Sequence, residues 1–358
     1  MDHARRQAAI EAHLEKLRLD ALLVTHLPNI RYLCGFTGSS GALLIHGGRS
    51  LFFTDGRYTA QAGAEVSRAR VVTVKGSPQL AAAQSAQRHR LRVLGIEGHH
   101  MTVSARTMLH RALGPKTRLR DSGPLVEKLR MVKDSDEIAL IREAVNLGAS
   151  LLDTAVRAIR PGVQEMEVAA ELEYAARRAG VEAMSFETIV AAGPRSAMPH
   201  GVASSAAIPA HGFVVLDFGV ILHGYCSDMT RTVHVGKVSA AERRMYQAVR
   251  EAQQAGMDAV RAGVACGEVD RAARNVLRRA GLARYFMHST GHGVGLEIHE
   301  APRFARGVAE TLHAGMVVTI EPGVYLPARA GVRIEDMMVI TQSGGDVLTP
   351  APKELIEL

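Results

Sequence analysis

The chain of 358 residues contains an internal repeat whose two copies lie 101 residues apart, and this repeat limits the folds that it can adopt. Arg-Pro-Gly-Val at 160–163 returns as Arg-Ala-Gly-Val at 261–264, and an Arg-Arg-Ala-Gly sequence follows both in the same register. After each copy comes an apolar strand that carries one acid, Asp217 in the first and Glu321 in the second. Such common residue types can match by chance, but the shared register favours two duplicated half-domains, each with helices and an antiparallel sheet. Ligands for a site at their junction would come from both halves.

The first third of the chain shows a different pattern, in which short apolar strands such as 21–25 and 93–96 alternate with helical segments. This alternation is typical of an α/β layer domain. Residues 1–125 hold 18 Lys and Arg against 8 Asp and Glu, whereas the remaining residues hold 25 against 28. We therefore expect an α/β domain at 1–125, a charged linker at 126–136 and a second domain at 137–358.

The composition excludes several classes of protein. The longest apolar run, 213–222, is interrupted by Asp217 and is far shorter than the roughly 20 residues that a membrane helix needs. Aromatic residues make up 4% of the chain and Trp is missing, so the basic charge lacks the stacking side chains of a nucleic-acid surface. Three cysteines are too few for a disulfide scaffold, which favours a reducing cytoplasm. Neither a membrane nor a nucleic acid is expected as a partner.

Two pairs of acids lie on the apolar strands of the repeat. If the first hairpin closes near 222–223, Asp217 and Asp228 face each other with their Cβ atoms about 4.5–5.5 Å apart. Glu321 and Glu335 repeat this arrangement in the second half. Buried like charges this close are unfavourable unless cations neutralise them, and four carboxylates balance two divalent cations. Alternatively, the acids lie at exposed sheet edges, or bulges keep the pairs apart.

Histidines supply the other candidate ligands. His292 and His299 lie in a glycine-containing stretch, in which the backbone can approach a ligand closely. His200 precedes the strand that carries Asp217. A lone histidine is more often structural than a ligand, so only clustering with the acids would identify one. Oxygen-rich ligation with one imidazole suits Mn²⁺, Co²⁺, Fe²⁺ or Zn²⁺. Two such ions about 3.5–4 Å apart are typical of hydrolytic sites.

These segments resemble the metallopeptidase family with the pita-bread fold that includes methionine aminopeptidase, aminopeptidase P and prolidase. Two further segments, TDGRY at 54–58 and KDSDEI at 133–138, are similar to the Xaa-Pro branch of that family. The resemblance implies an α/β N-terminal domain like that of creatinase. It also implies an α+β pita-bread catalytic domain of duplicated halves, with an antiparallel sheet covered by helices. The matching segments of the catalytic domain are LDFG at 216–219, SDMTRT at 227–232, STGHGVGLEIHE at 289–300, TIEPGVY at 319–325 and VRIED at 332–336.

The resemblance also implies roles for single residues. Asp217 and Asp228 would bind a first metal ion, His292 and Glu321 would bind a second, and Asp228 and Glu335 would bridge the two. Glu321 would also act as the proton shuttle. The residues implied to contact the substrate are His200, His288, His299, Tyr325 and Arg333, of which His200 and His299 would stabilise the tetrahedral intermediate.

The implied reaction is hydrolysis of the bond between an N-terminal residue and proline by a metallo-exopeptidase. Two divalent ions are expected, Mn²⁺ or Co²⁺ first, with Zn²⁺ or Fe²⁺ as alternatives. The segment 185–201 and the short N-terminal domain slightly favour an aminopeptidase P acting on short peptides over a prolidase restricted to dipeptides. A peptide-binding module without turnover is a third alternative. A cytoplasmic homodimer is expected.

One further hypothesis concerns the basic N-terminal domain. Arg31 or Arg57 could bind the C-terminal carboxylate of the substrate, because arginine presents a fork of donors to a carboxylate. Alternatively, the positive charges of this domain are spread over solvent.

Overall fold

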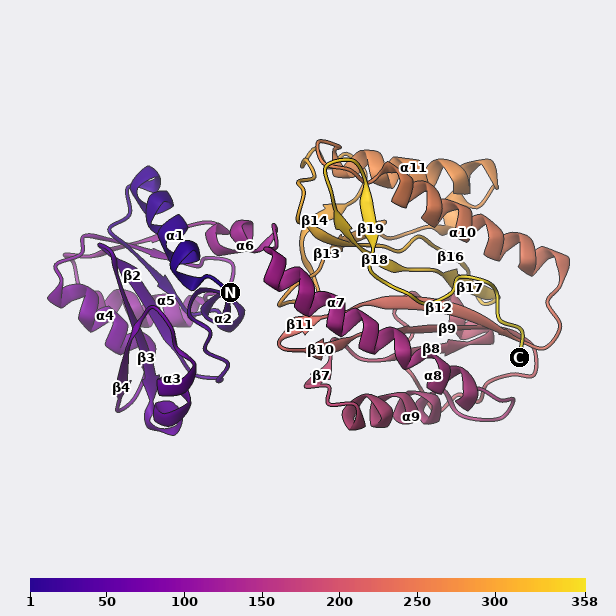
Figure 1. Ribbon diagram of the computed structural model, residues 1–358, viewed down its shortest axis with the longest axis horizontal. Coiled ribbons are helices and arrows are strands. Elements are labelled where there is room, and N and C mark those ends of the chain that lie inside the picture. Colours follow the sequence, from indigo (N-terminus) through magenta and orange to yellow (C-terminus); the bar gives the residue numbers. More distant parts are fainter. The chain divides into compact units, whose positions relative to one another are not determined.

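The computed structural model covers residues 1–358 and divides into two compact units, Met1–Arg130 and Met131–Leu358 (Figure 1). The first unit is an α/β domain and the second is a pita-bread domain, as the sequence predicts. None of the helices combines the length and the apolar character needed to cross a bilayer.

The first unit is built on a six-stranded mixed sheet in the order β4-β3-β2-β1-β5-β6. All four residues of β1 are buried, because helices cover both faces of the sheet. Leu23 and Leu44 pack with Ala83 of α4 and Leu109 of α5 in one core. Helix α1 contacts β1 and β2. The elements are α1 His3–Leu17, β1 Ala21–Val24, α2 Leu27–Cys34, β2 Ala42–His46, β3 Arg49–Asp55, η1 Gly56–Tyr58, α3 Thr59–Glu65, β4 Arg70–Val74, α4 Pro78–Arg88, β5 Val93–Ile96, α5 Val103–Leu113, β6 Arg118–Asp121 and α6 Leu125–Arg130.

The boundary of the first unit differs from the expected one. Residues expected at 126–136 as a linker include most of helix α6, which belongs to the first unit. Arg130 at its end is buried, and its Nη1 donates to Asn29 Oδ1 at 2.7 Å. The hypothesis that Arg57 binds the carboxylate of the substrate is also affected. Arg57 already donates hydrogen bonds to both side-chain oxygens of Asp55.

The second unit holds two halves, the first of which begins with helix α7. This helix begins with a capping box between Asp134 and Glu137. It ends at Ser150, and the N–H of Leu151 bonds the carbonyl only three residues back. The first half consists of α7 Ser135–Ser150, α8 Leu152–Ala158, α9 Glu165–Arg178, β7 Ala183–Met184, β8 Ile189–Ala192, η2 Gly193–Ala197, β9 Gly212–Phe218, β10 Val220–Leu222, β11 Tyr225–Cys226 and β12 Met229–Val235. The second half consists of α10 Ala240–Ala259, α11 Cys266–Arg279, η3 Ala283–Tyr285, β13 Gly291–Gly293, β14 Glu300–Phe304, β15 Val317–Ile320, β16 Gly323–Leu326, β17 Ala330–Arg333, β18 Asp336–Ile340 and β19 Gly345–Val347.

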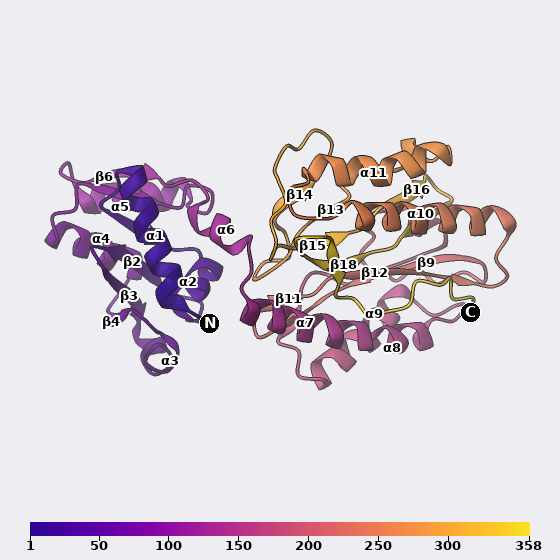
Figure 2. The ribbon, with the colours of Figure 1, turned by 45° about the horizontal axis from the view of Figure 1, so that its top comes forward.

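The repeat in the sequence corresponds to a repeat in the backbone. Gly162 and Gly263, at matching positions of the two copies, both adopt a φ of 88° in the turn between paired helices. The N–H of Gly162 bonds Ile208 O, and that of Gly263 bonds Leu312 O, both at 2.9 Å. In two views, α8 and α9 lie on one side of the sheets and α10 and α11 on the other (Figures 1 and 2). The prediction of duplicated half-domains is confirmed.

Candidate metal centre

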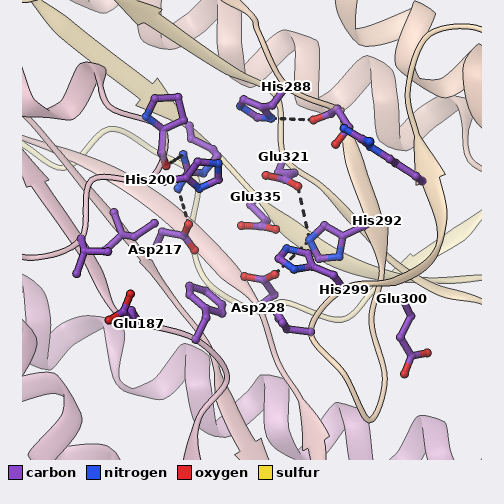
Figure 3. Close-up of a pocket in the computed structure, with 18 residues that line it drawn as sticks. Glu187, His200, Asp217, Asp228, His288, His292, His299, Glu300, Glu321 and Glu335 are labelled. Carbon is purple, nitrogen blue, oxygen red and sulfur yellow. Dashed lines mark hydrogen bonds and ion pairs between the residues drawn. The ribbon is translucent and has the colours of Figure 1, made fainter. Parts of the chain in front are cut away.

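A cavity of about 590 Å³ lies where the strands of the two halves meet. Figure 3 shows that four carboxylates converge in it beside the imidazole of His292. Glu187 and Glu300 also line the cavity but lie at its edge. The converging acids are Asp217, Asp228, Glu321 and Glu335, so the structure brings both predicted pairs into one place.

The first pair is not arranged as the sequence suggested. The hairpin closes at His223-Gly224, one residue later than expected, and Asp217 therefore faces Thr230 rather than Asp228. Both turn residues have positive φ, 52° and 78°, which is the backbone of the tight two-residue turns that match strand twist. Asp228 lies two residues before Thr230, the residue that faces Asp217. Side chains two residues apart along a strand lie on the same face, so Asp228 still projects to the same face as Asp217.

The second pair follows the expected arrangement. The β15–β18 pairing and the β16–β17 pairing share one register, in which position 321 lies opposite position 335. Glu335 also joins the two halves, since its Oε2 accepts a hydrogen bond from Thr230 Oγ1 at 2.7 Å. Its main chain makes a bridge with the same threonine. Carboxylates from separate halves are thus held side by side.

His292 has one ring nitrogen directed at the acids. Its Nδ1 lies 3.0 Å from its neighbour's carbonyl, Gly293 O, which fixes the proton on that nitrogen. Its Nε2 lies 3.6 Å from both Asp228 Oδ2 and Glu321 Oε1. Asp228, His292 and Glu335 have ligand atoms within 4.8 Å of one another, as a shared metal ion would require.

The charges in the cavity fit bound cations. Burial, with the charge of Glu335 adding to it, raises the pKa of Asp228 well above its usual value. Burial and Glu321 do the same to the pKa of Glu335, and burial raises the pKa of Glu321 to about 8. Asp217 Oδ1 is buried without a hydrogen-bond donor. Divalent cations would neutralise these acids and coordinate that oxygen.

Comparisons with known proteins agree with this geometry. Residues 139–342 match the model of metallopeptidase family M24, and residues 6–132 match the creatinase/prolidase N-terminal domain. This chain belongs to metallopeptidase family M24. It is similar to a Xaa-Pro dipeptidase of Pyrococcus horikoshii, at 35% identity over 96% of each chain.

Two solved structures resemble all or nearly all of the chain. The Xaa-Pro dipeptidase from Bacillus anthracis superimposes with a TM-score of 0.96, at 39% identity over 100% of both chains. The X-Pro aminopeptidase from Thermotoga maritima superimposes with a TM-score of 0.89, at 34% identity over 97% of this chain and 100% of that one. As a member of M24, the chain is a metallo-exopeptidase.

A second group of predicted residues forms one network beside the M24 acids. Arg333 donates through Nη2 to Asp217 Oδ2 and through Nη1 to the hydroxyl of Tyr325, the latter at 2.7 Å. The Tyr325 hydroxyl lies 2.9 Å from His288 Nε2. Burial and the charge of Arg333 lower the pKa of His288 to about 3, so its ring is neutral. This network holds one carboxylate of the centre in place.

The remaining predicted residues, His200 and His299, line the same cavity. The ring of His299 lies 4.5 Å from that of His292, centroid to centroid. Burial, followed by the charge of His200, lowers the pKa of His299. Both imidazoles therefore face the space that a substrate would fill.

Sequence reasoning missed several residues that shape this site. Thr230 bonds Glu335, and Lys133 makes a buried ion pair with Glu300 at 3.0 Å. Arg303 lines the cavity from β14, where it lies opposite His292. All but Arg303 lie within the segments that match the family, which was the available signal for them.

Proposed function

We propose that this M24 enzyme is a Xaa-Pro dipeptidase that hydrolyses dipeptides ending in proline at a dinuclear metal centre. The observation that carries the proposal is the convergence of four carboxylates and His292 from both halves in one cavity. Relatives named as dipeptidases support this activity better than the aminopeptidase P that the sequence slightly favoured.

The ligand assignment is part of this proposal. Asp217 and Asp228 would hold the first ion and His292 and Glu321 the second, with Asp228 and Glu335 shared between them. Bound divalent cations would polarise the scissile carbonyl and allow water to attack it at neutral pH. Mn²⁺ or Co²⁺ is the proposed metal, because the donor set is mostly carboxylate oxygen.

Side chains of the protein would transfer the proton and stabilise the charge that develops on the substrate. A carboxylate oxygen of Glu321 would accept the proton of the attacking water and pass it to the prolyl nitrogen as that nitrogen leaves. His200 and His299 would donate hydrogen bonds to the carbonyl oxygen as negative charge develops on it. Arg333 would keep Asp217 oriented throughout.

Arg303 offers a reason for a dipeptide preference. It lies opposite His292 across β13 and β14, so its guanidinium reaches the cavity next to the proposed metal ligands. The carboxylate of a dipeptide follows the scissile bond by one residue and would meet a cation at that place. Arginine can bind it with two parallel hydrogen bonds.

A substrate series tests this proposal. We expect Gly-Pro to be hydrolysed with a kcat/KM at least about 10-fold above that of Gly-Pro amide or a Gly-Pro-Xaa tripeptide, because a hydrogen bond to a charged group is worth about 1.5–3 kcal/mol. The Arg303→Leu variant should lose this preference. Arg306→Leu, which changes an exposed arginine that does not line the cavity, is the control.

Other outcomes of that series would identify other functions. Equal hydrolysis of the dipeptide and the tripeptide would indicate an aminopeptidase. Binding of the peptides by the metal-loaded protein without hydrolysis would indicate a peptide-binding module. We also propose a homodimer, which light scattering of the purified protein would test.

A further inference from the structure

A second group of metal-ligating side chains lies outside the M24 centre. His211, His234 and Glu242 place their ligand atoms within 4.8 Å of one another. His211 Nε2 lies 3.0 Å and His234 Nε2 lies 3.2 Å from the same oxygen, Glu242 Oε1. They come from three segments: the residue before β9, the end of β12 and the first turn of α10.

The buried member of the group lacks a hydrogen bond where a metal would bind. The side chain of His234 is 0% exposed, and its Nε2 makes no hydrogen bond of normal geometry. His234 Nε2 and Glu242 Oε1 are thus 3.2 Å apart without a hydrogen bond between them, whereas His211 Nε2 does bond that oxygen. A buried lone pair next to two further ligand atoms is an arrangement that a bound cation would satisfy.

The atoms around the group orient two of its members. His234 Nδ1 lies 2.9 Å from Gly236 O, which places the proton on Nδ1 and leaves the Nε2 lone pair unprotonated. Glu242 Oε2 accepts the N–H of Ser239 at 2.8 Å as part of the helix capping box, so Oε1 is turned toward the histidines. Metal-binding imidazoles and carboxylates are typically held by such outer contacts.

The distances and donor types fit one borderline-soft cation. Zinc lies about 2.0–2.2 Å from nitrogen and oxygen ligands, so neighbouring ligand atoms around it are about 3–3.5 Å apart. The separations of 3.0 and 3.2 Å agree with this value. His211 is 57% exposed, which leaves a route for the ion and space for a water as a fourth ligand.

The group is remote from the M24 centre. Asp217 lies near the end of β9 and Asp228 immediately precedes β12, whereas His211 and His234 lie at the opposite ends of these strands. Six residues along a strand separate each pair, which corresponds to about 20 Å. The C-terminal segment pairs here as well, since the N–H of His234 bonds Ile356 O and that of Leu358 bonds His234 O.

We propose that His211, His234 and Glu242 form a separate structural site for a single Zn²⁺-like transition-metal ion. The ion joins β9, β12 and α10 beside the C-terminal segment. The site contains neither a nucleophile nor a substrate cavity, so its effect is on stability. It does not depend on the proposed dipeptidase activity.

Zinc binding to matched variants of the full chain tests the site. His211→Asn removes one ligand, and Glu242→Gln removes the charged one while keeping an oxygen for Ser239. The control is His223→Asn, because His223 lies 3.5 Å from Glu143 in an exposed pair that lacks a third ligand. After equilibrium dialysis against Zn²⁺, wild type and the control should retain one zinc per chain more than the other two variants.

Two further measurements decide the outcome. The melting temperature of the wild type should rise on zinc addition by more than that of His211→Asn, and crystals soaked in zinc should show anomalous scattering between the three side chains. Wild type and variants have the same M24 centre, so zinc bound there contributes equally to each measurement and does not affect the difference between them. Equal zinc retention by wild type and His211→Asn, or no anomalous peak at this place, would overturn the proposal.

Discussion

At the scale of single residues, the acids of the M24 centre are placed where they repel one another. Asp228 is buried among Glu335, Asp217 and Glu321, all of which raise its pKa. A fold keeps such a group only if something compensates for it, and cations are the compensation that its geometry fits. Each acid therefore matters for metal binding more than for folding.

Replacing one of the proposed shared ligands tests this view. Asp228→Asn or Glu335→Gln should lower the bound metal by at least one ion per chain and reduce kcat by orders of magnitude. The metal-free variant should melt no lower than the metal-free wild type, because a buried like charge has been removed. Metal analysis and thermal unfolding would measure both effects, and two bound ions with a near-normal rate would refute the ligand assignment.

His200 is predicted to act differently from the acids. His200→Ala should lower kcat by about 10²–10³, the usual effect of removing one donor to a developing oxyanion, while the metal content stays unchanged. A parallel loss of metal would instead make His200 a ligand. Metal analysis of the same samples used for kinetics separates the two roles.

At the scale of elements, close approach of strands fixes the site. Gly219 lies between β9 and β10, and a Cβ there would overlap the carbonyl oxygen of Ser227, next to Asp228. Gly219→Ala should lower the free energy of unfolding by about 1–3 kcal/mol, as overpacking does, and weaken metal binding. Gly344→Ala, where a Cβ meets open space, is the control. Denaturant unfolding of both variants would show a difference, and equal stability would contradict this account.

The hairpins also show how far the sequence could predict the site. The apolar runs predicted strands at both acid pairs, although Asp228 and Glu321 lie just outside the observed strands. The second pair lies in the expected register. The first does not, because the pattern could not distinguish a turn at 222–223 from one at 223–224, which depends on two residues adopting positive φ. The Thr230–Glu335 bond joins residues 105 positions apart, and no local pattern indicates such a contact.

The predicted end of the first domain, residue 125, differs from the observed end at Arg130 for a similar reason. The segment after residue 125 is charged and resembles a linker, yet Arg130 is buried by its bond to Asn29, 101 residues away. A charged side chain with a distant partner has the same sequence signature as a solvated one. The alternation of strands and helices predicted the α/β first unit and the repeat predicted the two halves of the second, while the pita-bread fold came from the family resemblance. Long-range polar contacts were not predictable from any of these.

At the scale of the whole molecule, the M24 acids couple folding to pH and metal. Burial raises the pKa of Glu321 from 4.5 to about 8 in the metal-free fold. Between these values the folded chain binds more protons than the unfolded one, so its stability falls as pH rises. Each pKa unit corresponds to about 1.4 kcal/mol. Bound cations should reverse the trend, because they require deprotonated ligands.

Thermal unfolding with and without a chelator measures this coupling. The chelated protein should melt at progressively lower temperature from pH 4.5 to about 8, and Glu321→Gln should reduce that slope. The metal-loaded protein should instead lose stability toward acid pH. A chelated wild type whose melting temperature stays constant or rises over this interval would contradict the account.

The division of the centre between two halves has a consequence for biosynthesis. A ribosome synthesises the chain from the N-terminus, so under the proposed assignment the ligands His292, Glu321 and Glu335 emerge well after Asp217 and Asp228. A nascent or prematurely terminated chain that has folded its first half carries Asp217 and Asp228 alone. Under that assignment such a fragment lacks three of the five ligands, so hydrolytic activity cannot begin before Glu335 has been added to the chain.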